Sequence, residues 1–449
     1  MIDLVAPWRP AALLICLLAA LPAGAQSLPA LNAPITESSM SGFDAGGYMA
    51  GQFAMAWASQ MKGIGIVGAG PFGCALDEPP PLNRGLPSGP CAEGPPPFRT
   101  RLFTNAEALI DHAALDPLNY VRQQKIFVFH GSADKTLGRD VAEAGVEMWQ
   151  HLLGPERAGN LFYQGGIPAG HAMVTDGQNA AGCAASLPPF VAACGYDLAG
   201  NILRHIYGVL APAGQPVALQ SFEQARYTAP YSARSIGFAD NGLVYIPAAC
   251  AKGAPCRVHV VLHGCLQDAA RVGPSFATEA GYNGIAEANN IIVLYPQTTA
   301  TDGDRFSPIN PAGCWDWWGH AARGNDYLTR NGRQITALHN MLMAVSAGER
   351  PVRPPPSIPG AGPTTLDVLD TTPTSVALVW DAVPGAASYR LFRGEPDGRY
   401  LTVGIVYGTS YADTGLQPDT RYRWRVVARV RGTEGVPSPV VATSTKPSE

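Results

Sequence analysis

Charged residues are scarce in this chain, and so is net charge. Asp, Glu, Lys and Arg make up 15% of its 449 residues, and the formal net charge is −4 at pH 7. Without a basic excess, the sequence gives no reason to expect a nucleic-acid partner or an anionic membrane surface as target. Because 46% of the residues are hydrophobic, the low charge is not that of a disordered chain. A globular protein of two or three domains is expected.

Long apolar runs are also missing, with one exception near the N-terminus. Ala11 to Leu21 follows Arg9 and is closed by Ala23-Gly24-Ala25, a small-x-small pattern of the kind that signal peptidase cuts. Residues 1–25 are therefore predicted to be a secretory signal, with an uncleaved anchor as the alternative. No other run is long enough to cross a bilayer. We expect a secreted protein, extracellular or periplasmic, with no membrane span once the signal is removed.

The sequence contains no C-x-x-C pair, and its nine histidines are scattered, so neither a metal site nor another cofactor is expected. Cys16 leaves with the signal, and the other eight cysteines form an even set that suits an oxidising compartment. Short separations favour the pairs Cys74–Cys91, Cys183–Cys194 and Cys250–Cys256, which leaves Cys265 to pair with Cys314.

Proline marks one domain boundary. Residues 351–363 read PVRPPPSIPGAGP, a composition typical of a stiff, extended linker. It separates a predicted domain at 26–350 from another at 364–449. In the second, short β-rich runs alternate apolar and polar residues between turn signals, which is the pattern of a small sandwich.

This second domain resembles a fibronectin type III domain over about residues 364–446. The resemblance rests on Trp380 in an early strand, Tyr389 in the next, and the stretch from Leu416 to Tyr422, which is similar to that family's turn into a tyrosine-corner strand. It implies an all-β sandwich that acts as a spacer or weak binding module.

The first domain alternates strand-like and helical runs, which predicts an α/β fold with a mostly parallel sheet. The candidate strands are short and almost continuously apolar, as buried parallel strands are. They are Ile64 to Gly68, Lys125 to Phe129, Leu161 to Gln164, Arg257 to Leu262 and Ile291 to Tyr295.

Residues 41–49 read SGFDAGGYM, small residues around one polar residue just before an amphipathic helix. This is the layout of a nucleophile elbow, in which the central side chain projects into the site. G-x-S-x-G hydrolases have Ser at that position, whereas this chain has Asp44. Asp134 follows a strand and His171 lies in a Gly-rich loop, so the order nucleophile, acid, histidine matches that of α/β-hydrolases. In this interpretation Asp134 orients His171, the general base.

A fourth segment comes in an unusual order. His263-Gly264-Cys265 follows a predicted strand and resembles the H-G turn that supplies an oxyanion-hole N–H, which normally precedes the nucleophile. A circular permutation, in which the first strands were moved behind the last, explains this order. A coincidental H-G turn is the alternative.

Seven separated segments carry a wider resemblance over about residues 32–345. They are SGFDAGGYMA, PFGCA, FHGSADKTL, AGHAMVT, VVLHGCLQ, AGYNGIAEANNIIVLYPQ and CWDWWG. In this order they are similar to the secreted poly(3-hydroxybutyrate) depolymerases that have a circularly permuted α/β-hydrolase domain. The resemblance implies a carboxylic ester hydrolase that acts on polyester or 3-hydroxyalkanoate oligomers. It also implies a triad with Asp134 and His171, and oxyanion donors at Cys265 and Ala45.

Three tryptophans, Trp315, Trp317 and Trp318, follow Cys314. They predict either an apolar, partly exposed platform for a polyester chain or a core segment that supports the Cys265–Cys314 bridge.

Asp44 departs from the family pattern at the nucleophile. An aspartate of ordinary pKa, about 3.9, has no proton to give at neutral pH, so the usual serine esterase route is not available. The expected function is therefore a depolymerase-like ester hydrolase of low or altered activity. Two alternatives remain: a hydrolase with Asp44 as nucleophile, similar to dehalogenases or epoxide hydrolases, and a non-catalytic polyester or oligomer binder.

Overall fold

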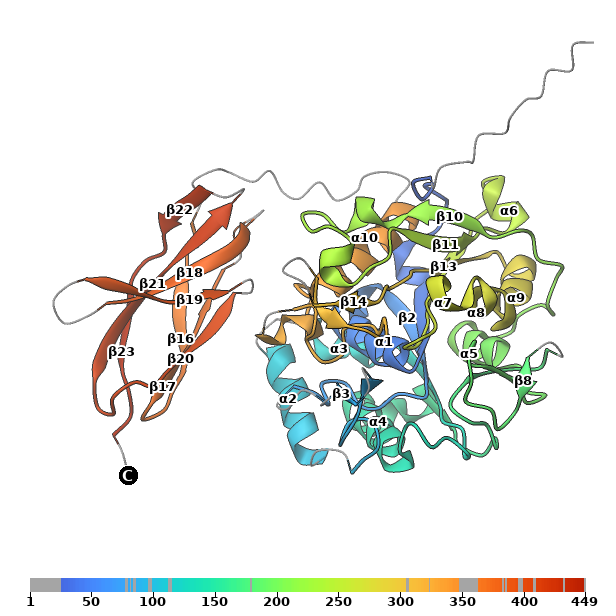
Figure 1. The fold of residues 1–449 in the computed structure, drawn as a ribbon, viewed down its shortest axis with the longest axis horizontal. Helices are drawn as coiled ribbons and strands as arrows, with labels where there is room; N and C mark the ends of the chain where they lie inside the picture. The colour runs from blue at the N-terminus through green and yellow to red at the C-terminus, as the bar shows by residue number, and fades with distance from the viewer. Residues whose placement is uncertain are drawn as a thin grey trace, which may run out of the picture.

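The computed structural model describes residues 26–346 and 362–447 (Figure 1). Short gaps fall at 77–79, 81, 84–85, 96–98, 112–114, 178–179, 304–306, 323, 382, 384–385, 395–398, 407–408 and 431–432. The predicted signal at 1–25 and most of the predicted linker, 351–361, lie outside the described residues. The helix α10 (Arg333–Ser346) is the last element before the linker, and the strand β16 (Leu366–Thr371) is the first one after it.

An eight-stranded sheet organises the first domain, in the spatial order β10-β11-β13-β12-β1-β2-β5-β6. Its strands are β1 (Ser38–Phe43), β2 (Met61–Val67), β5 (Lys125–Phe129), β6 (Leu161–Gln164), β10 (Gln220–Glu223), β11 (Asn241–Tyr245), β12 (Arg257–Leu262) and β13 (Ile291–Tyr295). Neighbours pair in parallel from β13 to β6, whereas β11 runs antiparallel to both β10 and β13.

The chain order of this sheet is permuted. If the strands are counted from β10 and the four N-terminal strands are added at the end, the spatial order becomes 1-2-4-3-5-6-7-8. This is the strand order of an α/β-hydrolase sheet, and β1 takes the fifth place, which leads into the nucleophile. The predicted permuted α/β-hydrolase fold is therefore confirmed.

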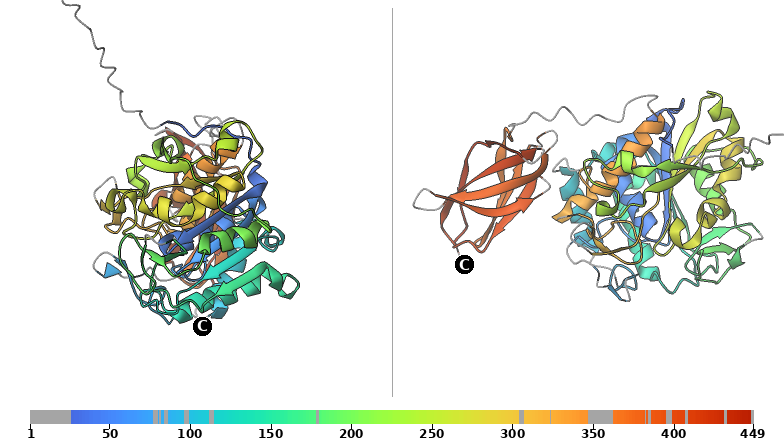
Figure 2. Two further views of the ribbon diagram at one scale, coloured as in Figure 1. Left: turned by 90° about the vertical axis from the view of Figure 1, so that its right-hand side faces the viewer. Right: turned by 45° about the horizontal axis from the view of Figure 1, so that its top comes forward.

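Helices cover both faces of the sheet (Figure 2). One core contains apolar side chains of α1 (Ala45–Ala56), α4 (Arg139–Leu153) and α10, including Phe53 and Trp149. The other core contains side chains of α5 (Leu198–Tyr207), α8 (Ser275–Glu279) and α9 (Tyr282–Ala288), including Ile202 and Ile285. In the described part of the chain, no helix has the length and apolar composition needed to span a membrane.

Buried serines make β1 unusual among the central strands. All six of its residues are buried, and the hydroxyls of Ser39 and Ser41 lie 2.6 and 2.8 Å from the two ring nitrogens of His259 on the neighbouring β12. Burial lowers the pKa of His259 to about 3, so its ring is neutral and can bond to both hydroxyls. This satisfied polar pairing ties β1 to β12, the two strands that lead into the nucleophile position and the H-G turn.

Four disulfides cross-link the first domain, and they join the cysteines in the predicted pairs. They are Cys74–Cys91, Cys183–Cys194, Cys250–Cys256 and Cys265–Cys314. Such bonds persist in oxidising compartments.

The C-terminal domain is a sandwich of two antiparallel sheets. One has the order β16-β17-β20, and the other β19-β18-β21-β22, with β23 also paired to β21. The strands after β16 are β17 (Ser375–Trp380), β18 (Ala386–Gly394), β19 (Tyr400–Val406), β20 (Ser410–Thr414), β21 (Arg421–Val430), β22 (Thr433–Pro437) and β23 (Val441–Ser444). The N–H of Gln417 donates to the Tyr422 hydroxyl at 3.0 Å, which forms the predicted tyrosine corner. The fibronectin type III-like sandwich is confirmed.

Asp413 gives a test of this domain's stability. Its buried carboxylate accepts hydrogen bonds from the Trp424 indole at 2.7 Å and from Arg393 at 3.2 Å. Asp413→Ala should destabilise the sandwich by about 3–5 kcal/mol, because it leaves the buried indole N–H of Trp424 without its acceptor and removes the carboxylate that pairs with Arg393. Hydrogen exchange of β21 peptides should then accelerate by about a hundredfold or more. Asp370→Asn, at an exposed position, is the control and should leave the exchange unchanged.

Candidate active site

Asp44 stands at a sharp turn between β1 and α1. Its backbone has φ 54° and ψ −122°, a strained conformation for a residue other than glycine. The turn needs glycine on both sides: a Cβ on Gly42 would lie 2.1 Å from the Gly46 carbonyl oxygen, and one on Gly46 would lie 2.4 Å from that of Leu262. The turn therefore has the geometry of a nucleophile elbow, with Asp44 in the central position.

The structure brings the predicted acid and histidine together. Asp134 lies in the loop after β5, and its Oδ2 accepts a hydrogen bond from His171 Nδ1 at 2.7 Å. Its other oxygen accepts from the backbone N–H groups of Thr136 and Leu137, at 2.8 and 3.0 Å. The backbone N–H of His171 donates to the Ser186 hydroxyl at 2.8 Å. Both the acid and the backbone of the histidine are thus fixed by partners other than each other.

The H-G turn lies beside Asp44 and joins the group formed by Asp44, Asp134 and His171. The backbone N–H of Cys265 donates to Asp44 Oδ2 at 2.8 Å, so the Asp44 carboxylate occupies the N–H that the family resemblance predicts as an oxyanion donor. Ala45, the other predicted donor, is the first residue of α1, where backbone N–H groups lack partners within the helix. His263 holds the turn, because its Nε2 accepts from the Thr298 N–H at 3.1 Å and its Nδ1 donates to the Gly264 carbonyl at 2.7 Å.

His171 lies between two carboxylates. Its Nε2 is 3.6 Å from Asp44 Oδ1, on the side of the ring opposite Asp134. Burial opposes protonation of the ring, but the hydrogen bond to Asp134 and the nearby Asp44 carboxylate outweigh it and raise the pKa of His171 to about 9. Burial would also raise the pKa of Asp134, but its bond to His171 lowers it. At neutral pH the ring is therefore an imidazolium.

The group opens on a cavity of about 300 Å³ with mostly apolar walls. Asp44 and His171 lie on its wall, and the Asp44 side chain is 23% exposed. Side chains distant in the sequence form the other walls; they include Tyr48, Leu86, Leu137, Phe190, Leu266 and Trp317. Sequence reasoning missed most of these residues. The positive φ angles of Phe190 and Leu266 are recognisable only from the folded chain.

Of the two alternatives for the tryptophan segment, burial favours the core segment over the partly exposed platform. Trp315, Trp317 and Trp318 are all buried, and only Trp317 lines the cavity. Trp315 packs edge-on against Phe238, with 5.4 Å between ring centroids. Trp317 stacks on Tyr48 at 4.4 Å, and Trp318 packs against Trp317. The segment is mainly core, because each indole finds an aromatic partner inside the domain.

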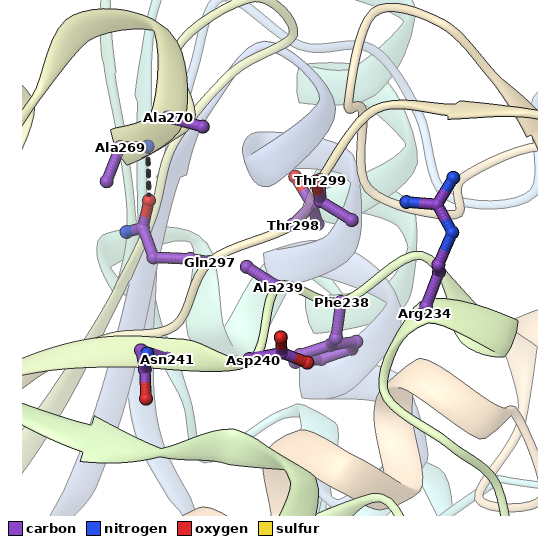
Figure 3. Close-up of a pocket in the computed structure, with 10 residues that line it drawn as sticks. All are labelled: Arg234, Phe238, Ala239, Asp240, Asn241, Ala269, Ala270, Gln297, Thr298 and Thr299. Atoms are coloured by element: carbon purple, nitrogen blue, oxygen red, sulfur yellow. Dashed lines mark hydrogen bonds between the residues drawn. The ribbon is translucent and has the colours of Figure 1, made fainter. Parts of the chain in front are cut away.

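A second hollow of about 460 Å³ contains none of the predicted catalytic residues (Figure 3). In it, Gln297 Oε1 accepts a hydrogen bond from the Ala269 N–H at 2.8 Å. Thr298 also lines it, and the backbone N–H of this residue bonds to His263. This hollow therefore lies beside the residue that holds the H-G turn.

Comparison with known proteins assigns the chain to a family, although no family model matches it. It is 34% identical over 426 residues to the poly(3-hydroxybutyrate) depolymerase of Delftia acidovorans, covering 92% of this chain and 80% of that protein. The polyhydroxybutyrate depolymerase of Talaromyces funiculosus is 32% identical over 336 residues, which are 72% of this chain and 94% of that one.

Solved structures agree with this assignment. The PHB depolymerase from Penicillium funiculosum has a TM-score of 0.63 and 30% identity, over 72% of this chain and 100% of that one. A PHB depolymerase complexed with an R3HB trimer matches over the same shares, with a TM-score of 0.64 and 30% identity. The chain therefore belongs to the poly(3-hydroxybutyrate) depolymerase family.

Proposed function

We propose that this protein is an exported hydrolase of 3-hydroxyalkanoate esters in which Asp44 slows the ester chemistry of the family. The observation that carries the proposal is the arrangement of Asp44, His171, Asp134 and the Cys265 N–H around one apolar cavity. The family relationship supports polyester or its oligomers as the substrate.

Two features of Asp44 slow the ester reaction. Attack of a carboxylate on an ester carbonyl gives a mixed anhydride, which is a poor intermediate beside the acyl-enzyme of a serine enzyme. Asp44 Oδ2 also occupies the Cys265 N–H, the donor that a reacting carbonyl oxygen would need. Ester hydrolysis by the unmodified protein therefore proceeds by attack of water, which neutral His171 deprotonates.

This route predicts a rate that rises with pH. Only the neutral imidazole can accept the proton of water, so hydrolysis of 3-hydroxybutyrate oligomers should increase as the pH rises through the pKa of His171, about 9. An NMR titration of His171 beside the rate profile checks this. Asp44→Asn removes one of the two flanking carboxylates, so both curves should move to lower pH. Curves that stay in place would contradict the contact between Asp44 and His171.

A non-catalytic binder is the second candidate, favoured by the occupied oxyanion donor. Incubation with 3-hydroxybutyrate oligomers and with a polymer suspension separates the two functions. Released acid supports the hydrolase, whereas protein that pellets with the polymer without releasing acid supports the binder.

Export to the periplasm or beyond is part of the proposal. The four disulfides support an oxidising destination. Cell fractionation, with mass spectrometry of the mature N-terminus, tests both the destination and cleavage after residue 25.

A further inference from the structure

We propose that Asp44 is a nucleophile toward saturated carbon, and that this site opens β-lactones of short 3-hydroxy acids through an ester of Asp44. This activity is distinct from the proposed ester hydrolysis, because the bond that breaks joins oxygen to an alkyl carbon. The two oxygens of Asp44 carry the inference. Oδ2 is held by the Cys265 N–H at 2.8 Å, whereas Oδ1 lies 3.6 Å from His171 Nε2.

The cavity makes Asp44 accessible to such a substrate. Of the two carboxylates beside His171, Asp134 is almost fully buried, with 2% of its side chain exposed, and its oxygens are engaged by His171 and two backbone N–H groups. Asp44 is 23% exposed and lies on the cavity wall. Asp44 is thus the carboxylate that can attack, and Asp134 the one that orients the ring.

The first step needs no proton. Asp44 Oδ1 attacks the ring carbon that bears the lactone oxygen, a new C–O bond forms, and the ring C–O bond breaks. The electron pair of the broken bond stays with the leaving carboxylate, which remains attached to the substrate. The product is an ordinary alkyl ester of Asp44, unlike the anhydride that attack at a carbonyl would give. The nearby imidazolium of His171 stabilises the leaving anion.

The second step, hydrolysis of the Asp44 ester, uses the contacts that Asp44 already makes with His171 and the Cys265 N–H. Esterification removes the negative charge of Asp44, so one of the two groups that favour the imidazolium is lost and His171 can become the base. Water attacks Cγ of Asp44 and gives its proton to His171. The oxyanion then forms on Oδ2, the oxygen that the Cys265 N–H already holds. When the intermediate collapses, the bond between Cγ and the alkyl oxygen breaks, and the leaving alkoxide takes the proton back from His171, which releases the 3-hydroxy acid. The second proton of the water is lost to solvent, and the Asp44 carboxylate is restored. Lactone and water are consumed in equal amounts.

The lining of the cavity narrows the class of substrate. The one phenol on its described wall, Tyr48, donates its hydroxyl proton to the Cys91 carbonyl at 2.6 Å. A lactone carboxylate or a halide leaves without a proton, so attack by Asp44 on such a substrate needs no free hydroxyl donor on this wall. The apolar walls and a volume of about 300 Å³ suit a small alkyl electrophile.

Isotope labelling tests the proposal on the intact protein. β-Butyrolactone is incubated with the protein in water enriched in ¹⁸O, and the product and the Asp44 peptide are analysed by mass spectrometry. The label should enter the Asp44 carboxylate and, in later turnovers, the hydroxyl of 3-hydroxybutyrate. Hydrolysis should exceed that by Asp44→Asn by about a hundredfold or more, while Asp176→Asn, an exposed control, should behave as the unmodified protein.

A trapping variant gives an independent readout. In His171→Gln the base is lost but Asp44 remains, so the protein mass should increase by one lactone and the added mass should map to Asp44. Near-ultraviolet circular dichroism verifies that each variant is folded. As a second electrophile, 1-bromobutane should likewise add its alkyl group to Asp44 in His171→Gln.

Two results would overturn the proposal. One is label in the product carboxyl group with none in Asp44, which would mean that water attacks the lactone carbonyl directly. The other is lactone hydrolysis no faster than with Asp44→Asn, together with no adduct in His171→Gln. Neither result bears on ester hydrolysis by water, which the oligomer assay and its pH profile measure separately.

Discussion

Asp44→Ser should raise the rate of ester hydrolysis by about 10⁴- to 10⁶-fold, since removal of a triad serine lowers kcat by up to about a million-fold. The strained turn at position 44 already aims its side chain at His171. The smaller serine would also free the Cys265 N–H for the ester carbonyl oxygen. With one flanking carboxylate gone, the pKa of His171 should fall and the neutral base should be populated at lower pH.

Short acyl esters and 3-hydroxybutyrate oligomers are suitable substrates for this measurement. Asp44→Ala is the matched control, because it frees the same N–H without supplying a nucleophile and should remain slow. Equal rates for the serine and alanine variants would show that the rest of the site does not support acyl transfer. An acyl-enzyme seen by intact-mass spectrometry in the serine variant alone would show that its ester hydrolysis proceeds through acylation of the introduced serine.

Asp134→Asn, made in the Asp44→Ser background, should lower kcat by about 10⁴-fold, the loss that this change produces in another triad enzyme. Asp134 Oδ2 accepts the Nδ1 proton of His171, whereas an amide NH₂ there favours the tautomer with the proton on Nε2. That tautomer cannot accept the serine proton. KM should change little, because Asp134 does not line the cavity.

Asp176→Asn in the same background is the control for loss of one carboxylate at an exposed position. An equal loss of activity in both variants would indicate a general effect of charge. A loss confined to Asp134→Asn, with the His171 pKa lowered in an NMR titration, would assign Asp134 the orienting role.

Much of the sheet can be predicted because its central strands are buried on both faces. The predicted strands at 125–129, 161–164, 257–262 and 291–295 have the observed bounds, and that at 64–68 corresponds to β2. The two antiparallel strands at one end of the sheet, β10 and β11, escape prediction. They contain polar residues and pair antiparallel, so neither a continuous apolar run nor a helix-strand alternation marks them.

In the candidate site, the residues proposed for the chemistry can be predicted from the sequence, whereas most of the cavity walls cannot. Asp44, Asp134, His171 and the H-G turn follow strand ends, and parallel strands bring their carboxyl ends to one edge. The cavity walls depend on packing between distant segments: Leu86 lies in a proline-rich stretch without periodicity, and Trp317 is placed by stacking on Tyr48. No local pattern records such contacts.

The permuted order also divides the large sheet into two halves, which are joined by the pairing of β1 with β12. Residues 208–219 connect the N-terminal four strands to the C-terminal four, and most of them are exposed. A cut within this connection would leave Asp44, Asp134 and His171 on one fragment and the Cys265 turn on the other. Ester hydrolysis by the Asp44→Ser variant, cut within this connection, would require β1 of one fragment to pair with β12 of the other. The rate of hydrolysis would therefore measure how much of the protein had reassembled from its two fragments.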